Sequence, residues 1–502
     1  MSYHRHPVAA GSLTVVFRST YMAVDFRGHP LFPPGFNSPT RFEADVFDCE
    51  VWGTVPGDIQ GNFYRMQCDF EYRPPMNEWM TGFNGDGHIS RLRFANGSVD
   101  YKGRYVKTAR IMAERHARRR LFGVYRNRFT DDPSVANINR SAANTHMYWH
   151  GGKLFTLKED SLPYYVDAQT LETLGDWDFE GKWTAKTMSA HPKIDPTTGE
   201  MVAYGYEAKG DLTKDIAVYI INPSGKVVRE WWLTSPYLGI IHDIAITQKH
   251  IIIPVIARTT SLERLQKGEP MWEWDGTLPT MVGILPRDGE AKDVRWYKGP
   301  ARNTLHFLNA TDRGSKITME LPTSSGERDP SQIRRWTFDL KSKQDSFLEE
   351  LVSTTPGILP RMDDRFLSLE YRYAFLSSRD PSISPDTTRA PAMAHLGRFA
   401  SNVLQRLDVR TGEIKQCAVE PVVSLQEAMF VPRANAKGEG DGYVMCVGSN
   451  FESMTSDLFI ADAQRLEQGV LATIKLPFRL RSGTHTNWYP QSVLPAVKDQ
   501  YT

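Results

Sequence analysis

The chain has 502 residues, with 60 lysines and arginines against 59 aspartates and glutamates, so its formal net charge is +1. This balance argues against nucleic acid as the main partner, and a hydrophobic content of 40% with 24% charged residues is typical of a soluble globular protein. The longest apolar runs, such as IIIPVIA from Ile251, are too short to span a bilayer, so we expect no stable membrane insertion.

The N-terminal stretch MSYHRHPVAAGSLTVVFRST contains no sustained apolar segment that ends in a cleavage site, so we predict no signal peptide. We interpret residues 1–45 as an N-terminal extension that packs on or near a single domain, which we take to cover 1–502. The cysteines form no CxxC pair and indicate buried thiols in a reducing compartment, so we expect a cytoplasmic protein. They are Cys49, Cys68, Cys417 and Cys446.

From about Val46 onward, short strand-like runs dominate the chain, among them KLFTLKED, MVAYGYEAKGD, IAVYIINPSGKVVREWWL, RFLSLEYRYAFL and VLQRLDVRTGEIKQCAVE. Polar turns with Asp and Gly separate many of these runs and predict hairpins. Many hairpins without alternating helices predict an all-β fold: a large barrel, a sandwich or a propeller. The theme recurs loosely every roughly 50–70 residues, as the blades of a propeller would.

Three polar inserts interrupt the strand pattern, at about 111–144, 260–280 and 377–399. Long loops on a rigid β scaffold often carry a binding surface. The stretch KTARIMAERHARRRLFGVY has helical apolar spacing and predicts a short helix that covers one face. We interpret the HARRR run within it as a solvated helix face rather than a patch for nucleic acid or acidic lipid.

Four histidines, far apart in the sequence, lie in short apolar segments of β character, and only the global fold can bring them together. They are His191, His242, His306 and His485. Each one alone is more often a hydrogen-bonded core or surface residue than a ligand. As a set on four strands, their neutral imidazoles suit iron, copper or zinc. Glu159 and Glu427 lie in apolar runs and suit the hydrogen bonds that ligating histidines need, although each could also face solvent from a strand edge.

The ordered motifs FNGDGH, KED, SAHPKIDPTTGEM, HDIAIT, HFLNA, EAMFVPR and THTNWYP resemble those of the carotenoid cleavage oxygenase family, over about 47–490. The resemblance implies a seven-bladed β-propeller, with loops and short helices capping the face over an axial metal site. It also implies Fe(II) held by the four histidines, with Glu159 and Glu427 as hydrogen-bond partners of two of them. The family usually has a third glutamate in an EFPRI-type motif, but here the motif reads GILPRM, with Ile358 at that position.

The segments LFGVYRNRFTDDPSV and LKED are similar to those of the stilbene-cleaving branch of this family, the lignostilbene and resveratrol dioxygenases. That branch binds the 4-hydroxyl of its substrate with a Tyr and a Lys, matched here by Tyr125 and Lys158, and packs a Phe on the ring, matched by Phe83. A Lys beside a phenol favours the phenolate, which donates electron density to the conjugated alkene. Without the resemblance, Lys158 would be interpreted as a surface lysine and Tyr125 as a packed aromatic residue.

The sequence therefore predicts a non-haem Fe(II) dioxygenase that cleaves the interphenyl double bond of a 4-hydroxystilbene with O2. Its partners would be a small phenolic substrate and O2, and the resemblance suggests a homodimer. Three other interpretations stay open: a carotenoid or apocarotenoid oxygenase, an oxygenase of phenylpropenes such as isoeugenol, and a propeller that binds a ligand without catalysis.

Overall fold

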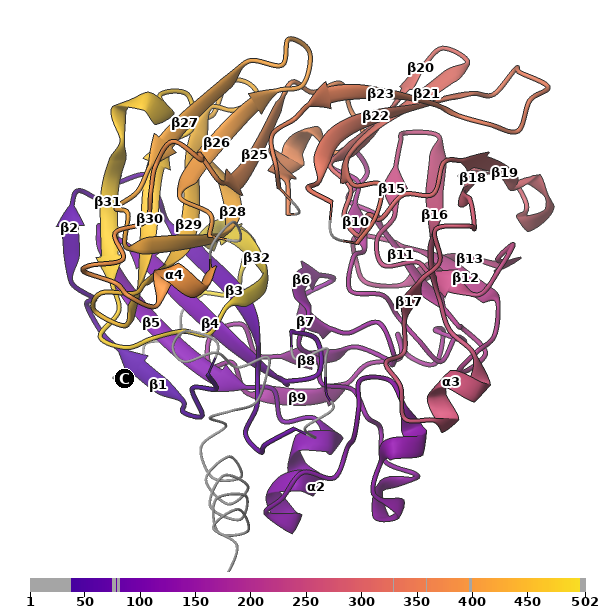
Figure 1. The fold of residues 1–502 in the computed structure, drawn as a ribbon, viewed down its shortest axis with the longest axis horizontal. Coiled ribbons are helices and arrows are strands. Elements are labelled where there is room, and N and C mark those ends of the chain that lie inside the picture. Colours follow the sequence, from indigo (N-terminus) through magenta and orange to yellow (C-terminus); the bar gives the residue numbers. More distant parts are fainter. Residues whose placement is uncertain are drawn as a thin grey trace, which may run out of the picture.

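The computed structural model describes residues 38–74, 78, 82–327, 329–357, 359–396 and 400–496. These residues form seven antiparallel sheets that follow one another around a centre, as the blades of a β-propeller do (Figure 1). The sequence predicted this all-β, seven-bladed fold, and the structure confirms it.

The blades are numbered here in chain order, and blade 1 contains β1 (Ala44–Val46), β3 (Gly61–Asp69), β4 (Asp86–Ala95), β5 (Ser98–Tyr105) and β32 (Gly483–Pro490). Blade 2 contains β6 (His146–His150), β7 (Lys153–Leu157), β8 (Tyr164–Val166) and β9 (Thr173–Asp176), and blade 3 contains β10 (Lys193–Ile194), β11 (Met201–Tyr206), β12 (Asp215–Ile221) and β13 (Val227–Thr234). Blade 4 contains β14 (Gly239–Ile240), β15 (Ala245–Ile246), β16 (His250–Thr259), β17 (Glu273–Trp274), β18 (Thr280–Pro286) and β19 (Arg295–Gly299). Blade 5 contains β20 (Asn309–Arg313), β21 (Lys316–Thr323), β22 (Gln332–Asp339) and β23 (Leu348–Ser353). Blade 6 contains β24 (Arg361–Met362), β25 (Tyr373–Ser378), β26 (Val403–Asp408) and β27 (Ile414–Ala418). Blade 7 contains β28 (Val423–Pro432), β29 (Gly442–Asn450), β30 (Thr455–Asp462) and β31 (Val470–Lys475), and β2 (Val51–Gly53) joins it from the start of the chain.

Strands from the two ends of the described chain close the ring. The last strand, β32, pairs with β3 in blade 1, with Phe63 opposite Trp488. The early strand β2 pairs with β31 in blade 7, so that blades 1 and 7 are each built from both ends of the chain. In Figure 1, β6, β28 and β32 lie toward the centre of the ring.

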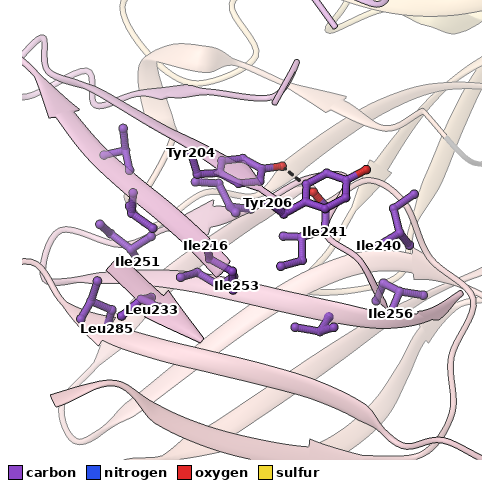
Figure 2. Packing of buried hydrophobic residues seen from close by; sticks show 14 of the residues in the cluster. Tyr204, Tyr206, Ile216, Leu233, Ile240, Ile241, Ile251, Ile253, Ile256 and Leu285 are labelled. Atoms are coloured by element: carbon purple, nitrogen blue, oxygen red, sulfur yellow. Dashed lines mark hydrogen bonds between the residues drawn. The ribbon is translucent and has the colours of Figure 1, made fainter. Parts of the chain in front are cut away.

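Hydrophobic layers between neighbouring blades hold the ring together. Figure 2 shows one such layer, in which isoleucines and leucines of blades 3 and 4 interdigitate. Ile216 and Ile253, from different blades, are both fully buried there. Tyr204 spans the layer, and its hydroxyl donates to the backbone oxygen of Ile241 over 3.2 Å. Strands buried on both faces explain the continuous apolar runs, such as IIIPVIA, in the sequence.

The predicted helix exists and is α2 (Ala109–Ala117), which begins where the hydroxyl of Thr108 accepts a hydrogen bond from the Ile111 N–H. Arg118 and Arg119 of the HARRR run are exposed, as we predicted, whereas Arg120 turns inward to Glu114. Within the described residues, the other helical segments are α3 (Leu262–Gln266), α4 (Met393–Leu396), η1 (Arg128–Thr130), η2 (Pro133–Val135), η3 (Ala291–Asp293), η4 (Asp364–Phe366), η6 (Leu466–Gln468) and η7 (Gln491–Val493). All three predicted inserts thus contain short helices.

Much of the predicted N-terminal extension, 1–37, lies outside the described residues. Where the description begins, Thr40 hydrogen-bonds to Asp69 of β3 and the backbone of Ser38 accepts from Arg479. All four cysteines are buried and free, which confirms the prediction of buried thiols. No helix within the described ranges is long and apolar enough to cross a membrane.

Candidate metal centre and substrate site

The four predicted histidines lie together at the centre of the ring. His191 precedes β10, His242 lies between β14 and β15, His306 precedes β20, and His485 lies within β32. The expectation that all four lie on strands is wrong, because only His485 does. The other three are in buried or half-buried connecting segments, whose apolar residues give the same sequence pattern as a strand.

The geometry of the cluster suits one metal ion. One ring nitrogen from each histidine lies within 4.8 Å of those of the other three. His191 Nε2 and His242 Nε2 are 3.1 Å apart. Two nitrogens that each lie roughly 2.1 Å from a common ion, at a right angle, are separated by roughly 3 Å. Burial and the neighbouring histidines hold the pKa of His191 well below its usual range, so that its ring is neutral and able to act as a ligand.

Two buried glutamates orient two of these rings. Glu159, which follows β7, has its Oε2 2.8 Å from His242 Nδ1, and Glu427 on β28 has its Oε1 2.9 Å from His485 Nδ1. Each carboxylate fixes the Nδ1–H tautomer and leaves Nε2 to face the centre. Burial alone would raise the pKa of Glu159, but His242, Arg126 and Lys158 outweigh it and lower that pKa far below its usual range.

The predicted substrate residues meet on one side of this cluster. Tyr125 donates its hydroxyl to Glu159 Oε1 over 2.5 Å. The Nζ of Lys158 lies 4.7 Å from the centre of the Tyr125 ring and donates to the backbone oxygen of Phe83 over 2.8 Å. The rings of Phe83 and Tyr125 are 6.1 Å apart. The chain therefore brings an aromatic surface, a hydroxyl and an amine together, and links them to His242 through one carboxylate.

Lys158 is almost completely buried, and among the described residues it makes no salt bridge. Burial lowers its pKa, while Cys68, Asp160 and Glu159 act in the opposite direction. Burial and Glu159 raise the pKa of Tyr125 well above its usual range, so its hydroxyl stays protonated. A buried amine without an anionic partner is costly, which suits a site whose ligand brings the partner.

Known proteins are similar to this chain over most of its length. The family described as Retinal pigment epithelial membrane protein matches residues 36–490. Isoeugenol monooxygenase of Pseudomonas nitroreducens is 40% identical in an alignment of 471 residues that covers 90% of this chain and 96% of that protein. Resveratrol cleavage oxygenase 1 of Aspergillus fumigatus is 36% identical over 492 residues, with 93% and 97% covered. The crystal structure of Pseudomonas brassicacearum lignostilbene dioxygenase has 37% identity and a TM-score of 0.87, and the match covers 92% of this chain and 99% of that one.

The chain belongs to the carotenoid cleavage oxygenase family. It is therefore an oxygenase that cleaves a carbon–carbon double bond, and this excludes the interpretation as a propeller without catalysis. Like other oxygenases, it acts on a small substrate together with O2. Ile358, at the position of the third glutamate of the family, lies outside the described residues.

Sequence reasoning missed the residues that hold Tyr125 and Glu159 in place. Arg126 has a φ of 52°, in the left-handed region that residues other than glycine seldom adopt. Its guanidinium donates to the Tyr206 hydroxyl over 2.7 Å, forms a close ion pair with Glu207, and lies 3.7 Å from Glu159. This buried network fixes the Tyr125 backbone. Neighbouring residues in the sequence gave no signal of it, since the partners come from β11 and its loop.

This oxygenase also has a fifth histidine beside the cluster, a buried one that the sequence analysis did not single out. His146, the first residue of β6, has its ring 4.6 Å from that of His485 and 5.4 Å from that of His191. Neither of its ring nitrogens makes a hydrogen bond of good geometry, although the backbone of Ala190 lies near enough to affect its pKa. Burial and His485 lower that pKa well below its usual range. The motif NTHMYWH carried the only sequence signal, and in it His146 looks like an ordinary strand residue.

A cavity of about 330 Å³ reaches the cluster. His146, His191, His306 and His485 line its inner end, whereas Phe83, Tyr125 and Lys158 do not line it. The cavity and the substrate residues therefore approach the histidines from different sides.

Proposed function

We propose that this oxygenase is a non-haem Fe(II) enzyme that cleaves the interphenyl C=C bond of 4-hydroxystilbenes such as resveratrol, piceatannol and lignostilbene, giving two aromatic aldehydes. The observation that carries the proposal is the buried Lys158 amine, held against Tyr125 and Phe83 and joined to the histidine cluster through Glu159. The names of relatives that act on resveratrol and lignostilbene support the same substrate class.

The residues fit Fe(II). Four neutral imidazoles leave the full charge of a divalent ion uncompensated by ligands, and imidazole suits iron. His191, His242, His306 and His485 would hold the ion, with Glu159 and Glu427 setting the orientation of two rings. Bound there, Fe(II) supplies the redox chemistry that activates O2.

The protein's own residues prepare the substrate. A 4-hydroxyphenyl ring stacked near Phe83 would place its hydroxyl between Lys158 and Tyr125. An ammonium at Lys158 beside the hydroxyl would lower the pKa of the phenol and stabilise the phenolate, whose proton would be released to water on binding. The Tyr125 hydroxyl donates to Glu159 in the structure and can rotate, so it would turn to donate to the phenolate oxygen and orient the substrate. The phenolate then pushes electron density through the ring toward the alkene carbons.

A second candidate substrate class is the 4-hydroxyphenylpropenes, since isoeugenol monooxygenase is 40% identical to this chain. Both classes share the 4-hydroxyl that Lys158 and Tyr125 would bind, and they differ in the group on the far side of the alkene. Carotenoids and apocarotenoids fit less well, because their polyene carries no phenol that would become an anion and pair with a buried amine. A phenolic substrate arriving from water also fits a cytoplasmic enzyme.

The test is anaerobic reconstitution with Fe(II), followed by O2 and resveratrol, with products identified by mass spectrometry. We expect 3,5-dihydroxybenzaldehyde and 4-hydroxybenzaldehyde. Cleavage of isoeugenol with resveratrol left intact would select the second candidate, and cleavage of apocarotenals alone would refute both.

A variant separates the role of the lysine from that of the metal. Lys158→Met fills the same space without a charge or a donor, and we expect turnover of 4-hydroxystilbenes to fall by roughly 10²–10⁴-fold while iron content is unchanged. Methylating the 4-hydroxyl of the substrate should cost wild-type enzyme a similar factor and cost the variant little more. Equal rates for wild type and variant would contradict the phenolate mechanism.

A further inference from the structure

His146 occupies a position that its surroundings do not explain. It is buried, it makes no hydrogen bond of good geometry from either ring nitrogen, and it lines the cavity next to two of the cluster histidines. A buried imidazole without partners is costly, and such exceptions in a folded protein call for a reason. The ring is not part of the predicted four-histidine set, whose nitrogens all lie within 4.8 Å of one another.

The rings of His146, His191 and His485 nevertheless form a group of their own. Their separations from His146, 4.6 Å and 5.4 Å, are comparable with the 4.6–5.1 Å between rings inside the cluster. Neutral histidines in threes and fours are ligands for divalent transition metals. The cluster is thus extended on the cavity side by one further potential ligand.

Charged side chains lie among apolar ones in the wall of the cavity. Three are carboxylates, Asp243, Asp364 and Glu427, and three are basic, Lys193, Arg361 and Arg365. The inner carboxylates are buried and paired: Asp243 lies 2.7 Å from Lys193, and Glu427 lies 3.7 Å from Arg361. Asp364 also pairs with Arg361, over 3.4 Å, but 59% of its side chain is accessible, so we place the outer end of the cavity at this residue.

The other side of the cluster holds the predicted substrate residues. There the aromatic rings of Phe83 and Tyr125 and the buried amine of Lys158 lie beside Glu159 and His242. A divalent ion approaching from that side would have to share the path of the substrate.

We propose that the cavity is the route by which the metal ion reaches the cluster, and that His146 is its docking ligand. An incoming divalent cation would exchange water for His146 first, and then for His191 and His485, before it settles among the four histidines. This inference rests on the proposed metal function. The two sides of the cluster then have different roles, because the metal enters from the cavity and the phenol binds on the side of Lys158.

The test measures the rate of metal loading, independent of turnover. Apo-protein prepared with a chelator is mixed with Co²⁺, and binding is followed by the visible absorbance of the ion and by metal content. His146→Phe keeps the ring volume but removes both nitrogens. We expect its loading and its release of metal to slow by roughly tenfold or more, with the dissociation constant unchanged, because only the pathway is altered. The matched control is His150→Phe, on the same strand β6 but hydrogen-bonded to Asn222, which should load like wild type.

Charge reversal at the surface provides a second test that does not depend on the stability of a core variant. Asp364→Lys at the outer end of the cavity should slow Co²⁺ loading by roughly three- to tenfold at low salt, and the effect should fade as salt is added. Its control is Asp211→Lys, also exposed, whose carboxylate pairs with Arg128 near Tyr125 on the substrate side.

Loading rates within twofold of wild type for both His146→Phe and Asp364→Lys would overturn the proposal. So would a larger effect from Asp211→Lys than from Asp364→Lys, which would place the route on the substrate side. If wild-type protein binds no divalent metal at all, the metal function itself fails; normal binding with unchanged rates refutes only the route.

Discussion

Glu159 and Glu427 each accept a hydrogen bond from a cluster histidine, yet changing each to glutamine should have unequal consequences. The Oε1 of Glu159 accepts from the Tyr125 hydroxyl, which can rotate, and its Oε2 accepts from His242. In Glu159→Gln, the amide oxygen can stay with His242 while its NH2 donates to the Tyr125 oxygen. Replacing the carboxylate that hydrogen-bonds to a metal-ligating histidine typically weakens metal binding by about 10–100-fold, or about 1.4–2.7 kcal/mol.

The hydrogen bonds of Glu427 cannot rearrange in this way when it is changed to glutamine. Its Oε1 accepts from His485 Nδ1, and its Oε2 accepts from both the backbone N–H and the hydroxyl of Thr486. The amide NH2 in Glu427→Gln must therefore face a ring N–H or a backbone N–H, and neither can reverse. A buried donor left unsatisfied costs about 1–3 kcal/mol more, so we expect a total of about 3–5 kcal/mol.

The assay for both variants has two parts: the metal dissociation constant by competition with a coloured chelator, and the free energy of unfolding of the apo-protein in urea. The loss of metal-binding free energy and the loss of unfolding free energy are summed, because the cost of an unsatisfied donor can appear in either measurement. Glu207→Gln is the control, since Glu207 contacts Arg126 and the Leu212 N–H but no histidine. Its metal affinity should change by less than about threefold. A summed loss for Glu159→Gln equal to or above that for Glu427→Gln would refute the reasoning.

Two further predictions concern stability. Burial raises the pKa of Asp86 to about 6, with Arg110 opposing and Glu114 reinforcing the shift. Because the folded pKa lies above the unfolded value, the stability that this carboxyl contributes is complete below about pH 4 and is lost as pH rises through 6. In urea titrations, the free energy of unfolding of wild type, relative to that of Asp86→Asn, should fall by about 2–3 kcal/mol between pH 4 and 7. A difference that stays constant with pH would contradict this prediction. Ile253→Ala, in the layer of Figure 2, should lower the free energy of unfolding by about 2–5 kcal/mol. The control Ile414→Ala, on the surface, should lower it by under about 0.5 kcal/mol. Similar losses for the two variants would show that the layer between blades is not a tightly packed core.

The sequence was sufficient for the repeated hairpins and, through ordered motifs, for the family and the set of four histidines. It misassigned the local structure of three of them, because a buried connection beside the axis has the same apolar pattern as a strand. It placed Tyr125 with the substrate alone, whereas the structure also ties it to Glu159. Contacts of this kind depend on how the loop after α2 folds back, and no spacing in the chain encodes that path.

His146 shows the same limit from another direction. Its neighbours in the motif NTHMYWH are ordinary strand residues, and its importance comes only from the rings beside it, which belong to distant segments. A lone histidine on a strand is usually structural, so sequence reasoning passes over it. Only the closed ring gives it metal ligands as neighbours.

The position of His485 on the closing strand β32 has a consequence for biosynthesis. A polypeptide leaving the ribosome can build blades 2 to 6 as their hairpins appear, but blade 1 waits for β32 to pair with β3. The fourth histidine arrives with that same strand. Tight metal capture should therefore be among the last events of maturation, and a nascent chain with an unsealed ring would hold at most three of the four histidines. Metal retention would then report that the ring has closed, which makes it a convenient marker for sorting complete molecules from misassembled ones.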